Sequence, residues 1–285
     1  MREIKSICVI GGGTMGRQIA LNAAIYGFRA NLYVRRPEKQ AEVTAWMEDY
    51  MAGRIKKGRL SQEQVDAAKA LFFVIGDFAE AVSGVDCVIE AISEIEEQKR
   101  ALFKQISDAV DEDVLIATNS SYMVSSRFAD CVKNPARLAN MHFYNPALVL
   151  KFVEIVQGPH TSEDTARAMY EFCERTGKMP IWMKKEIPGF AANYILRGIY
   201  QKGRELVEGG YCSYQDVDKA CEFGLNHPMG PFRLNDLTGI DLQFDIMTNQ
   251  YKETGVKPPC YDLFADMVAQ GKFGRKTGHG FYDYE

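Results

Sequence analysis

The stretch Ile4–Gly16, which reads IKSICVIGGGTMG, decides the fold of this chain of 285 residues. It begins as a β-branched run, typical of a buried strand, and ends in glycines. An apolar pattern with helical spacing follows from Met15 to Tyr26 and stops at Gly27, and Arg29–Val34 is strand-like again. A strand, a helix and a strand over about thirty residues form one βαβ unit. We therefore expect a right-handed crossover and parallel pairing of the two strands.

The alternation of strand and helix patterns continues along the chain. A helical pattern covers Glu94–Val110, and further apolar runs predict buried strands. These runs are Leu71–Gly76, Asp86–Ile92, Val114–Thr118, Arg137–Met141, Lys151–Val156 and Met179–Trp182. Together they predict an α/β fold with a doubly wound sheet.

The strand patterns stop at the charged, Pro- and Gly-containing segment Lys184–Gly189. Beyond it the apolar spacing is helical, as in Ile195, Ile199 and Leu206. We expect two domains, a sheet domain over residues 1–186 and an all-helical domain over residues 187–285. The apolar faces of the second domain exceed what one small bundle covers, which predicts a homodimer.

Composition argues against several classes of partner. The net charge of −4 and the isoelectric point near 5.7 give no reason to expect binding to nucleic acid or to an anionic membrane. No apolar run approaches the roughly 20 residues of a spanning helix, and the first residues lack the features of a secretory signal. The seven cysteines have no metal-ligand spacing. We expect a cytoplasmic protein without a metal site.

The glycines of the first stretch fit the GxGxxG pattern, with Gly11, Gly13 and Gly16 at the three glycine positions and Thr14 and Met15 between the last two. In this pattern the glycines allow a tight turn, close approach to a pyrophosphate and close helix packing, and the helix N-terminus faces the phosphates. Because the motif follows a strand and opens a helix, it predicts a Rossmann-type dinucleotide site. The alternative is a glycine-rich turn without a ligand.

The end of the second predicted strand bears on the choice of cofactor. A domain that binds NAD usually has an acidic residue there, and this chain has Val34, followed by Arg35 and Arg36. Guanidinium groups suit a 2′-phosphate and stack on adenine, so we favour NADP over NAD. The alternative is that both arginines simply face water.

A histidine and a glutamate stand at two neighbouring predicted strands. His142 follows Arg137–Met141, and Glu154 lies in the next strand. Oxidation of an alcohol needs a base that works near neutral pH, and a carboxylate can hold the imidazole and stabilise its charged form. The pair predicts a proton-transfer site, although a single histidine among aromatic residues is more often structural.

Small polar residues end another strand. Asn119 and Ser121 follow Val114–Thr118, and Asn193 begins the first long C-terminal helix. Ser121 and Asn193 can hydrogen-bond a substrate oxygen from two sides, or can serve as helix caps. No GxSxG setting surrounds Ser121, which argues against covalent catalysis.

Seven motifs together give the chain a specific resemblance. They are VIGGGTMG at 9–16, VIEA at 88–91, NSS at 119–121, HFYNP at 142–146, PGF at 188–190, NHPMGP at 226–231 and GRKTGHGFY at 274–282. From Ile7 to Tyr284 the sequence resembles the short-form 3-hydroxyacyl-CoA dehydrogenases, especially the bacterial 3-hydroxybutyryl-CoA dehydrogenases. The resemblance implies hydride transfer between a nicotinamide and the 3-carbon of an acyl-CoA.

The resemblance also implies roles for individual residues. His142 is the implied acid/base with Glu154 as its partner, and Ser121, Asn193 and Asn145 are implied contacts of the substrate. Glu94, Lys99 and Asn119 match residues on the nicotinamide side of the cofactor. Val34, where the family has an acidic residue, and Tyr194, where an arginine usually follows the asparagine, depart from the family pattern.

The segment Lys56–Arg59, with Arg54 nearby, matches the basic helix end that meets CoA phosphates in the family. Cations gathered there suit a polyanion, and the resemblance favours Lys57 and Arg54 over a merely solvated charged face. Two other functions stay open. One is a related dehydrogenase of a free hydroxy acid such as carnitine or a sugar acid, and the other is a non-catalytic dinucleotide-binding protein.

Overall fold

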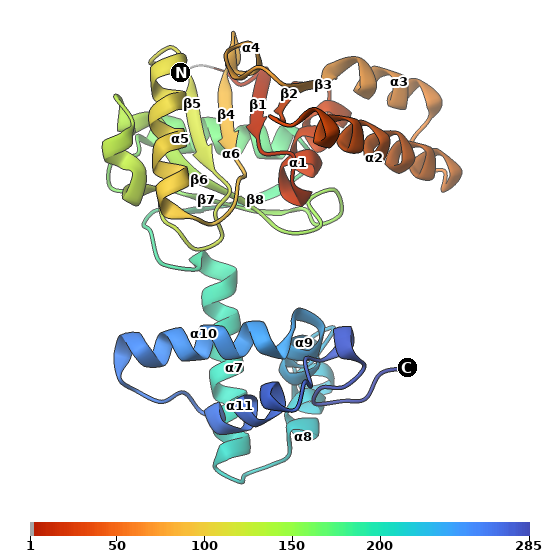
Figure 1. The fold of residues 1–285 in the computed structure, drawn as a ribbon, viewed down its shortest axis with the longest axis vertical. Coiled ribbons are helices and arrows are strands. Elements are labelled where there is room, and N and C mark those ends of the chain that lie inside the picture. Colours follow the sequence, from red (N-terminus) through yellow and green to blue (C-terminus); the bar gives the residue numbers. More distant parts are fainter. Residues whose placement is uncertain (1–2) are drawn as a thin grey trace. The chain divides into compact units, whose positions relative to one another are not determined.

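The computed structural model describes residues 3–285 (Figure 1). The chain divides into two compact units, the first ending at Ala191 and the second running from Ala192 to Glu285. The first unit holds an eight-stranded sheet. Its strands are β1 (Ser6–Ile10), β2 (Arg29–Tyr33), β3 (Phe72–Ile75), β4 (Cys87–Glu90), β5 (Leu115–Thr118), β6 (Leu138–Phe143), β7 (Phe152–Val156) and β8 (Met179–Met183).

Six α-helices connect these strands. They are α1 (Thr14–Ile25), α2 (Pro37–Lys56), α3 (Gln62–Leu71), α4 (Phe78–Val82), α5 (Glu96–Ala109) and α6 (Glu163–Arg175), with the short 3-10 helices η1 (Ser125–Cys131) and η2 (Pro135–Arg137) before β6. The N-terminus of α3 shows that residues close together in the sequence determine where a helix begins. Ser61 and Gln64 form a reciprocal capping box, so two backbone donors of the first turn are satisfied.

The strand order is β3-β2-β1-β4-β5-β6-β7-β8. β1 pairs in parallel with β2 and with β4, so the chain reverses its direction of travel across the sheet at β1 and β4. Open α/β sheets bind ligands in the crevice at such a reversal, outside the carboxyl ends of the strands. The doubly wound sheet and the parallel pairing of β1 with β2 in the first βαβ motif, both predicted from the sequence, are confirmed.

The two faces of the sheet carry separate apolar cores, because side chains alternate along each strand. On β1, Ile7 and Val9 join the core formed with α1, α2 and α6. Cys8 and Ile10 join the core formed with α4, α5 and η1. Burial raises the pKa of the Cys8 thiol to about 12, so Cys8 behaves as a small apolar side chain.

The last two strands depart from the parallel pattern. β7 pairs antiparallel with β6, and β8 pairs in parallel with β7. Only residues 144–151 connect β6 and β7. This connection is too short for the crossover that a parallel neighbour needs, so the chain turns back alongside β6. A second difference concerns His142, which lies inside β6 rather than after it.

The second unit is helical. It comprises most of α7 (Phe190–Glu208), then α8 (Tyr214–Lys219), the π-helical turn η3 (Ala220–Gly224), α9 (Pro231–Thr238), α10 (Ile240–Thr254), α11 (Tyr261–Ala269) and the 3-10 turn η4 (Arg275–Thr277). Aromatic rings such as Phe232 and Phe281, with centroids 4.8 Å apart, fill its core. Among the described residues, 3–285, no helix is long and apolar enough to cross a membrane.

Candidate active site

Buried polar side chains gather on the face of the sheet that packs against α5 and η1. Leu138 of β6 belongs to the apolar core on that face, and alternation places Asn140 and His142 on the same side. The row of buried polar residues, each at most 3% exposed, consists of Glu90, Thr118, Asn140, His142 and Glu154. A polar row inside an otherwise apolar core costs stability unless its members pair. They do pair, and the contacts define a site.

His142 and Glu154 are register partners on the antiparallel strands β6 and β7. Directly opposed residues of such strands have adjacent Cβ atoms, so the two side chains meet without help from a loop. The imidazole Nδ1 lies 2.8 Å from Glu154 Oε2, and Nε2 lies 3.0 Å from the Oγ of Ser121, in the loop after β5. A carboxylate can only accept, so Nδ1 carries the proton and Nε2 presents its lone pair towards Ser121.

Aromatic rings and a backbone amide hold this pair in place. The His142 ring contacts the rings of Tyr144 and Phe190, with centroid distances of 4.5 Å and 5.4 Å. The N–H of Ala191 donates to Glu154 Oε1 at 2.9 Å, and the Tyr144 hydroxyl donates to Glu154 Oε2 at 3.0 Å. The imidazole therefore has a fixed orientation, with Nε2 facing Ser121.

The glycine loop after β1 has the shape that a pyrophosphate needs. Gly11 has a φ of +122°, and a Cβ there would meet the Ala91 carbonyl oxygen at 2.5 Å. A Cβ on Gly16 would lie 1.9 Å from the Gly11 oxygen, whereas a Cβ on Gly13 would meet nothing within 4 Å. The first and third glycines thus serve the turn and the packing, and the second leaves open space.

Helix α1 begins directly at this loop with Thr14 and Met15 in its first turn. Gly13 is its N-cap, no side chain caps it, and its first turn contains no acidic residue. The first backbone N–H groups of a helix have no partner within the helix, and the helix dipole favours an anion there. The loop and α1 therefore fit the phosphates of a dinucleotide.

The residues after β2 carry the features that bear on cofactor choice. Val34 is buried, and a Cβ on Gly12 would lie 2.7 Å from its Cγ2, so this side chain packs against the glycine loop. Arg35 and Arg36 are exposed, and Arg36 Nε lies 3.6 Å from Glu38 Oε1. A surface pair of this kind contributes little, so Arg36 can exchange Glu38 for another anion at small cost.

A second polar network lies beside the Ser121 loop. The ammonium of Lys99 is buried and lies 2.6 Å from Glu90 Oε1 and 3.8 Å from Glu94 Oε2. Glu94 accepts from the Ser120 hydroxyl at 2.8 Å and from the Ser121 N–H at 3.3 Å. The half-exposed Glu94 thus fixes the backbone that carries Ser121, and the buried Glu90 compensates the charge of Lys99.

The three asparagines predicted as site residues lie in different parts of the structure. Asn119 is buried, and its Oδ1 accepts the Phe143 N–H at 2.9 Å, which ties the loop after β5 to the end of β6. Asn145 is exposed, and its Oδ1 accepts from Gln18 Nε2 at 3.4 Å. Asn193 lies in α7 and belongs to the second unit.

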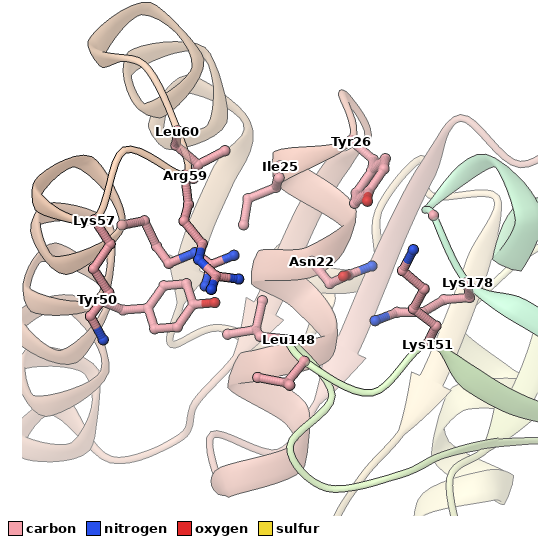
Figure 2. Close-up of a pocket in the computed structure, with 13 residues that line it drawn as sticks. Asn22, Ile25, Tyr26, Tyr50, Lys57, Arg59, Leu60, Leu148, Lys151 and Lys178 are labelled. Atoms are coloured by element: carbon pink, nitrogen blue, oxygen red, sulfur yellow. The ribbon is translucent and has the colours of Figure 1, made fainter.

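A basic cavity of about 540 Å³ lies between α1, the end of α2 and the loop that precedes β7. Figure 2 shows Lys57 and Arg59 entering from one side and Lys151 and Lys178 from the other. Arg54 lines it as well, and none of the described residues that line it is acidic. The cavity therefore concentrates positive charge, as a polyanionic group requires.

Two of these cations were not indicated by the sequence. Lys151 and Lys178 are far in sequence from Arg54 and Lys57, and only the fold brings them together. Burial lowers the pKa of the Lys178 ammonium to about 8, and this ammonium donates to the carbonyl oxygens of Ala147 and Leu150. Lys178 thereby holds the loop that follows the His142 strand.

Among residues 3–285, no cluster of His, Cys, Asp and Glu could hold a metal ion.

Comparisons with known proteins agree with this geometry. A family model described as 3-hydroxyacyl-CoA dehydrogenase, NAD binding domain, matches residues 6–187, and the model of that family's C-terminal domain matches residues 189–284. The chain is 33% identical over 285 residues to a probable 3-hydroxybutyryl-CoA dehydrogenase of Bacillus subtilis, which covers 99% of this chain and 98% of the relative.

Solved structures give the same result. An (S)-3-hydroxybutyryl-CoA dehydrogenase from Ralstonia eutropha is similar with a TM-score of 0.90 and 31% identity, covering 99% of this chain and 100% of that chain. A diketoreductase that acts on dicarbonyl compounds has a TM-score of 0.87 and 27% identity, with 100% of both chains covered. The family resemblance predicted from the motifs is confirmed, and the chain belongs to the 3-hydroxyacyl-CoA dehydrogenase family of NAD-dependent oxidoreductases.

Proposed function

We propose that this enzyme interconverts (S)-3-hydroxyacyl-CoA, with 3-hydroxybutyryl-CoA as the main substrate, and the corresponding 3-ketoacyl-CoA, acetoacetyl-CoA. The observation that carries the proposal is the buried pair of His142 and Glu154, whose free imidazole nitrogen lies 3.0 Å from the Ser121 hydroxyl. The 3-hydroxybutyryl-CoA dehydrogenases among its relatives support the same substrate class.

In the oxidation direction, His142 Nε2 takes the proton of the substrate's 3-hydroxyl group, and the C–O bond becomes a carbonyl as hydride leaves the 3-carbon. A bound nicotinamide supplies the acceptor of that hydride and, in reverse, its donor. Glu154 stabilises the imidazolium that forms, and Ser121 and Asn193 position the reacting oxygen. In the reduction direction His142 returns the proton to the oxygen.

The cofactor lies along the glycine loop in this proposal. Gly11, Gly13, Thr14, Met15 and Gly16 hold the pyrophosphate through backbone N–H groups and the start of α1. On the nicotinamide side, the contacts come from the network around the Ser121 loop, namely Glu94, Lys99 and Asn119. Support for this side is the half-exposed carboxylate of Glu94, which already contacts the loop that carries Ser121.

The CoA part of the substrate engages the basic cavity, with Arg54 and Lys57 as contacts of its phosphates. Asn145, exposed in the loop between β6 and β7, contacts the acyl end of the substrate. The support for CoA over a free acid is the charge of the cavity, because a small carboxylic acid carries one negative charge and has no polyanionic group for several cations to bind.

The assay that tests the substrate compares acetoacetyl-CoA with free acetoacetate in the presence of NADPH. We expect kcat/KM to be at least about 100-fold higher for the thioester, because several charge-assisted contacts are lost without CoA. Lys57→Ala should raise KM for acetoacetyl-CoA about tenfold with little change in kcat, since this contact is made equally in ground and transition states.

Lys133→Ala is the matched control, because Lys133 is an exposed lysine that does not line the cavity and lies 2.8 Å from Asp108. Its KM should stay within about twofold of the unmodified enzyme. Equal kcat/KM for acetoacetate and acetoacetyl-CoA would favour a dehydrogenase of free hydroxy or dicarbonyl compounds, as the similarity to a diketoreductase suggests. Dinucleotide binding without turnover of either compound would indicate a non-catalytic protein.

For the cofactor we propose NADP in preference to NAD. Arg35 and Arg36 are exposed at the end of β2, and no acidic side chain stands at Val34 to accept a ribose hydroxyl or repel a 2′-phosphate. Arg36→Ala should lower kcat/KM for NADPH about tenfold and leave the value for NADH nearly unchanged, because a charge-assisted hydrogen bond is lost with one cofactor only.

Lys39→Ala is the matched control for that measurement, because the Lys39 ammonium is held by Glu42 at 2.6 Å. It should change neither cofactor's kcat/KM by more than about twofold. A wild-type preference for NADH, or an equal effect of Arg36→Ala on both cofactors, would contradict the assignment to NADP.

We further propose a cytoplasmic homodimer that pairs through the helical unit. Leu242 and Ile246, one turn apart on α10, are 50% and 44% exposed, and Phe223 and Leu225 after α8 are 83% and 65% exposed. Large apolar side chains with this much exposure are typical of a surface that a second chain covers.

A further inference from the structure

The hydroxyl of Tyr144 contacts Glu154, the partner of His142, but the proposed reaction gives this hydroxyl no role. Tyr144 lies in the loop directly after β6, and its hydroxyl donates to Glu154 Oε2 at 3.0 Å. The same oxygen lies 2.8 Å from His142 Nδ1. Two donors, one phenolic and one on the imidazole, thus share a single carboxylate oxygen.

The phenol remains a donor over the whole pH range in which an imidazole titrates. Burial, and secondly the charge of Glu154, raise the pKa of the Tyr144 hydroxyl well above its usual value. Ring contacts keep the phenol in place, with the Phe152 ring 5.2 Å and the His142 ring 4.5 Å away between centroids. The phenol can therefore donate to Glu154 in either protonation state of His142.

The burial of Glu154 increases the effect of a second hydrogen-bond donor on the charge of its carboxylate. Glu154 is fully buried, so its charge is not screened by solvent. The groups that contact it include His142 on β6, Tyr144 after β6 and the Ala191 N–H at the start of α7, which donates to Oε1. Glu94 contacts the backbone of Ser121, whose hydroxyl lies 3.0 Å from His142 Nε2 on the other side of the imidazole.

We propose that Tyr144 is a positioning residue that limits how strongly Glu154 stabilises the imidazolium form of His142. A carboxylate oxygen that accepts a phenolic hydrogen bond has less negative charge to offer to its second donor. The hydroxyl thereby keeps a larger share of His142 neutral, in the form that takes the proton of the alcohol. This inference rests on the proposed role of His142, and its test separates the two.

The test replaces Tyr144 by Phe, which removes the hydroxyl and keeps the ring. Without this donor Glu154 stabilises the imidazolium more strongly, so protonation of His142 persists to higher pH. The acid limb of kcat/KM for alcohol oxidation and the basic limb for ketone reduction should both move upward by about half a pH unit. Tyr170→Phe, on α6, is the matched control and should move neither limb.

A merely structural role of Tyr144 gives a different result. It would lower activity at every pH without moving the limbs, and that outcome, like a downward shift, would overturn the proposal. Movement of both limbs in the upward direction supports it, because loss of packing has no reason to act on one protonation state.

A titration that needs no turnover provides the second measurement. With histidine labelled by ¹⁵N, NMR follows the protonation of His142 directly, and the chain has four histidines to assign. The midpoint should rise in Tyr144→Phe, and it should rise much less when the same change is made in Glu154→Gln. Equal shifts in both backgrounds would overturn the proposal. If the native enzyme fails to reduce acetoacetyl-CoA while the NMR shift depends on Glu154, the proposed substrate fails and this inference stands.

Discussion

Replacing His142 by Gln is expected to lower kcat for acetoacetyl-CoA reduction by roughly 10³-fold, within the range that general acid–base catalysis contributes. Gln keeps a polar side chain in the pocket but has no group that gives or takes a proton near neutral pH. Steady-state kinetics with NADPH measures the loss. It should appear in kcat as well as in kcat/KM, because the proton transfer belongs to the transition state.

Two controls make this result specific. The dissociation constant for NADPH should stay within about twofold. His142 lies on β6, next to the Ser121 hydroxyl, and is not part of the glycine loop that holds the pyrophosphate. His160→Gln changes another histidine of the same unit, one that is partly buried, and should reduce kcat by less than about threefold. Near-normal turnover of His142→Gln would remove the central residue of the mechanism.

Replacing Gly16 by Ala is expected to weaken NADPH binding by about 100-fold or more. The new Cβ would lie 1.9 Å from the Gly11 carbonyl oxygen and 3.4 Å from Val9 Cγ1. The first of these atoms is backbone, so the loop must move away from α1, and several N–H contacts to the pyrophosphate are lost together. Fluorescence titration of the purified variant with NADPH gives the affinity.

The thermal unfolding of the same variant shows whether it is folded when binding is measured. Gly53→Ala is the matched control, because Gly53 lies inside α2 and a Cβ there meets nothing within 4 Å. That variant should bind NADPH normally and be more stable by about 0.5–1 kcal/mol, since alanine favours a helix over glycine. A folded Gly16→Ala variant with native affinity would contradict the assignment of the loop.

Features of the structure that depend on residues close together in the sequence could be predicted. Ile4–Gly16 carries its own strand, turn and helix signals, and the loop has the predicted shape at Gly11 and Gly16. The pairing of His142 with a carboxylate on the next strand was also accessible, because consecutive strands often lie side by side.

Features that depend on pairing register and on distant segments were not predictable. The connection of residues 144–151 is too short for a parallel crossover, but nothing in the sequence gives the register that places Glu154 directly opposite His142. The approach of Lys151 and Lys178 to the end of α2 depends on the packing of the whole first unit. The contact of the Tyr144 hydroxyl with Glu154 depends on how the chain bends after β6.

The most direct measurement of the central claim is a single turnover. Enzyme saturated with NADPH is mixed rapidly with acetoacetyl-CoA, and the loss of reduced-nicotinamide absorbance is followed for the native protein and for His142→Gln. If the imidazole moves the proton, the native enzyme oxidises its bound NADPH in one fast phase and the variant does so roughly 10³-fold more slowly. A variant that completes this phase at the native rate would show that His142 takes no part in the chemical step.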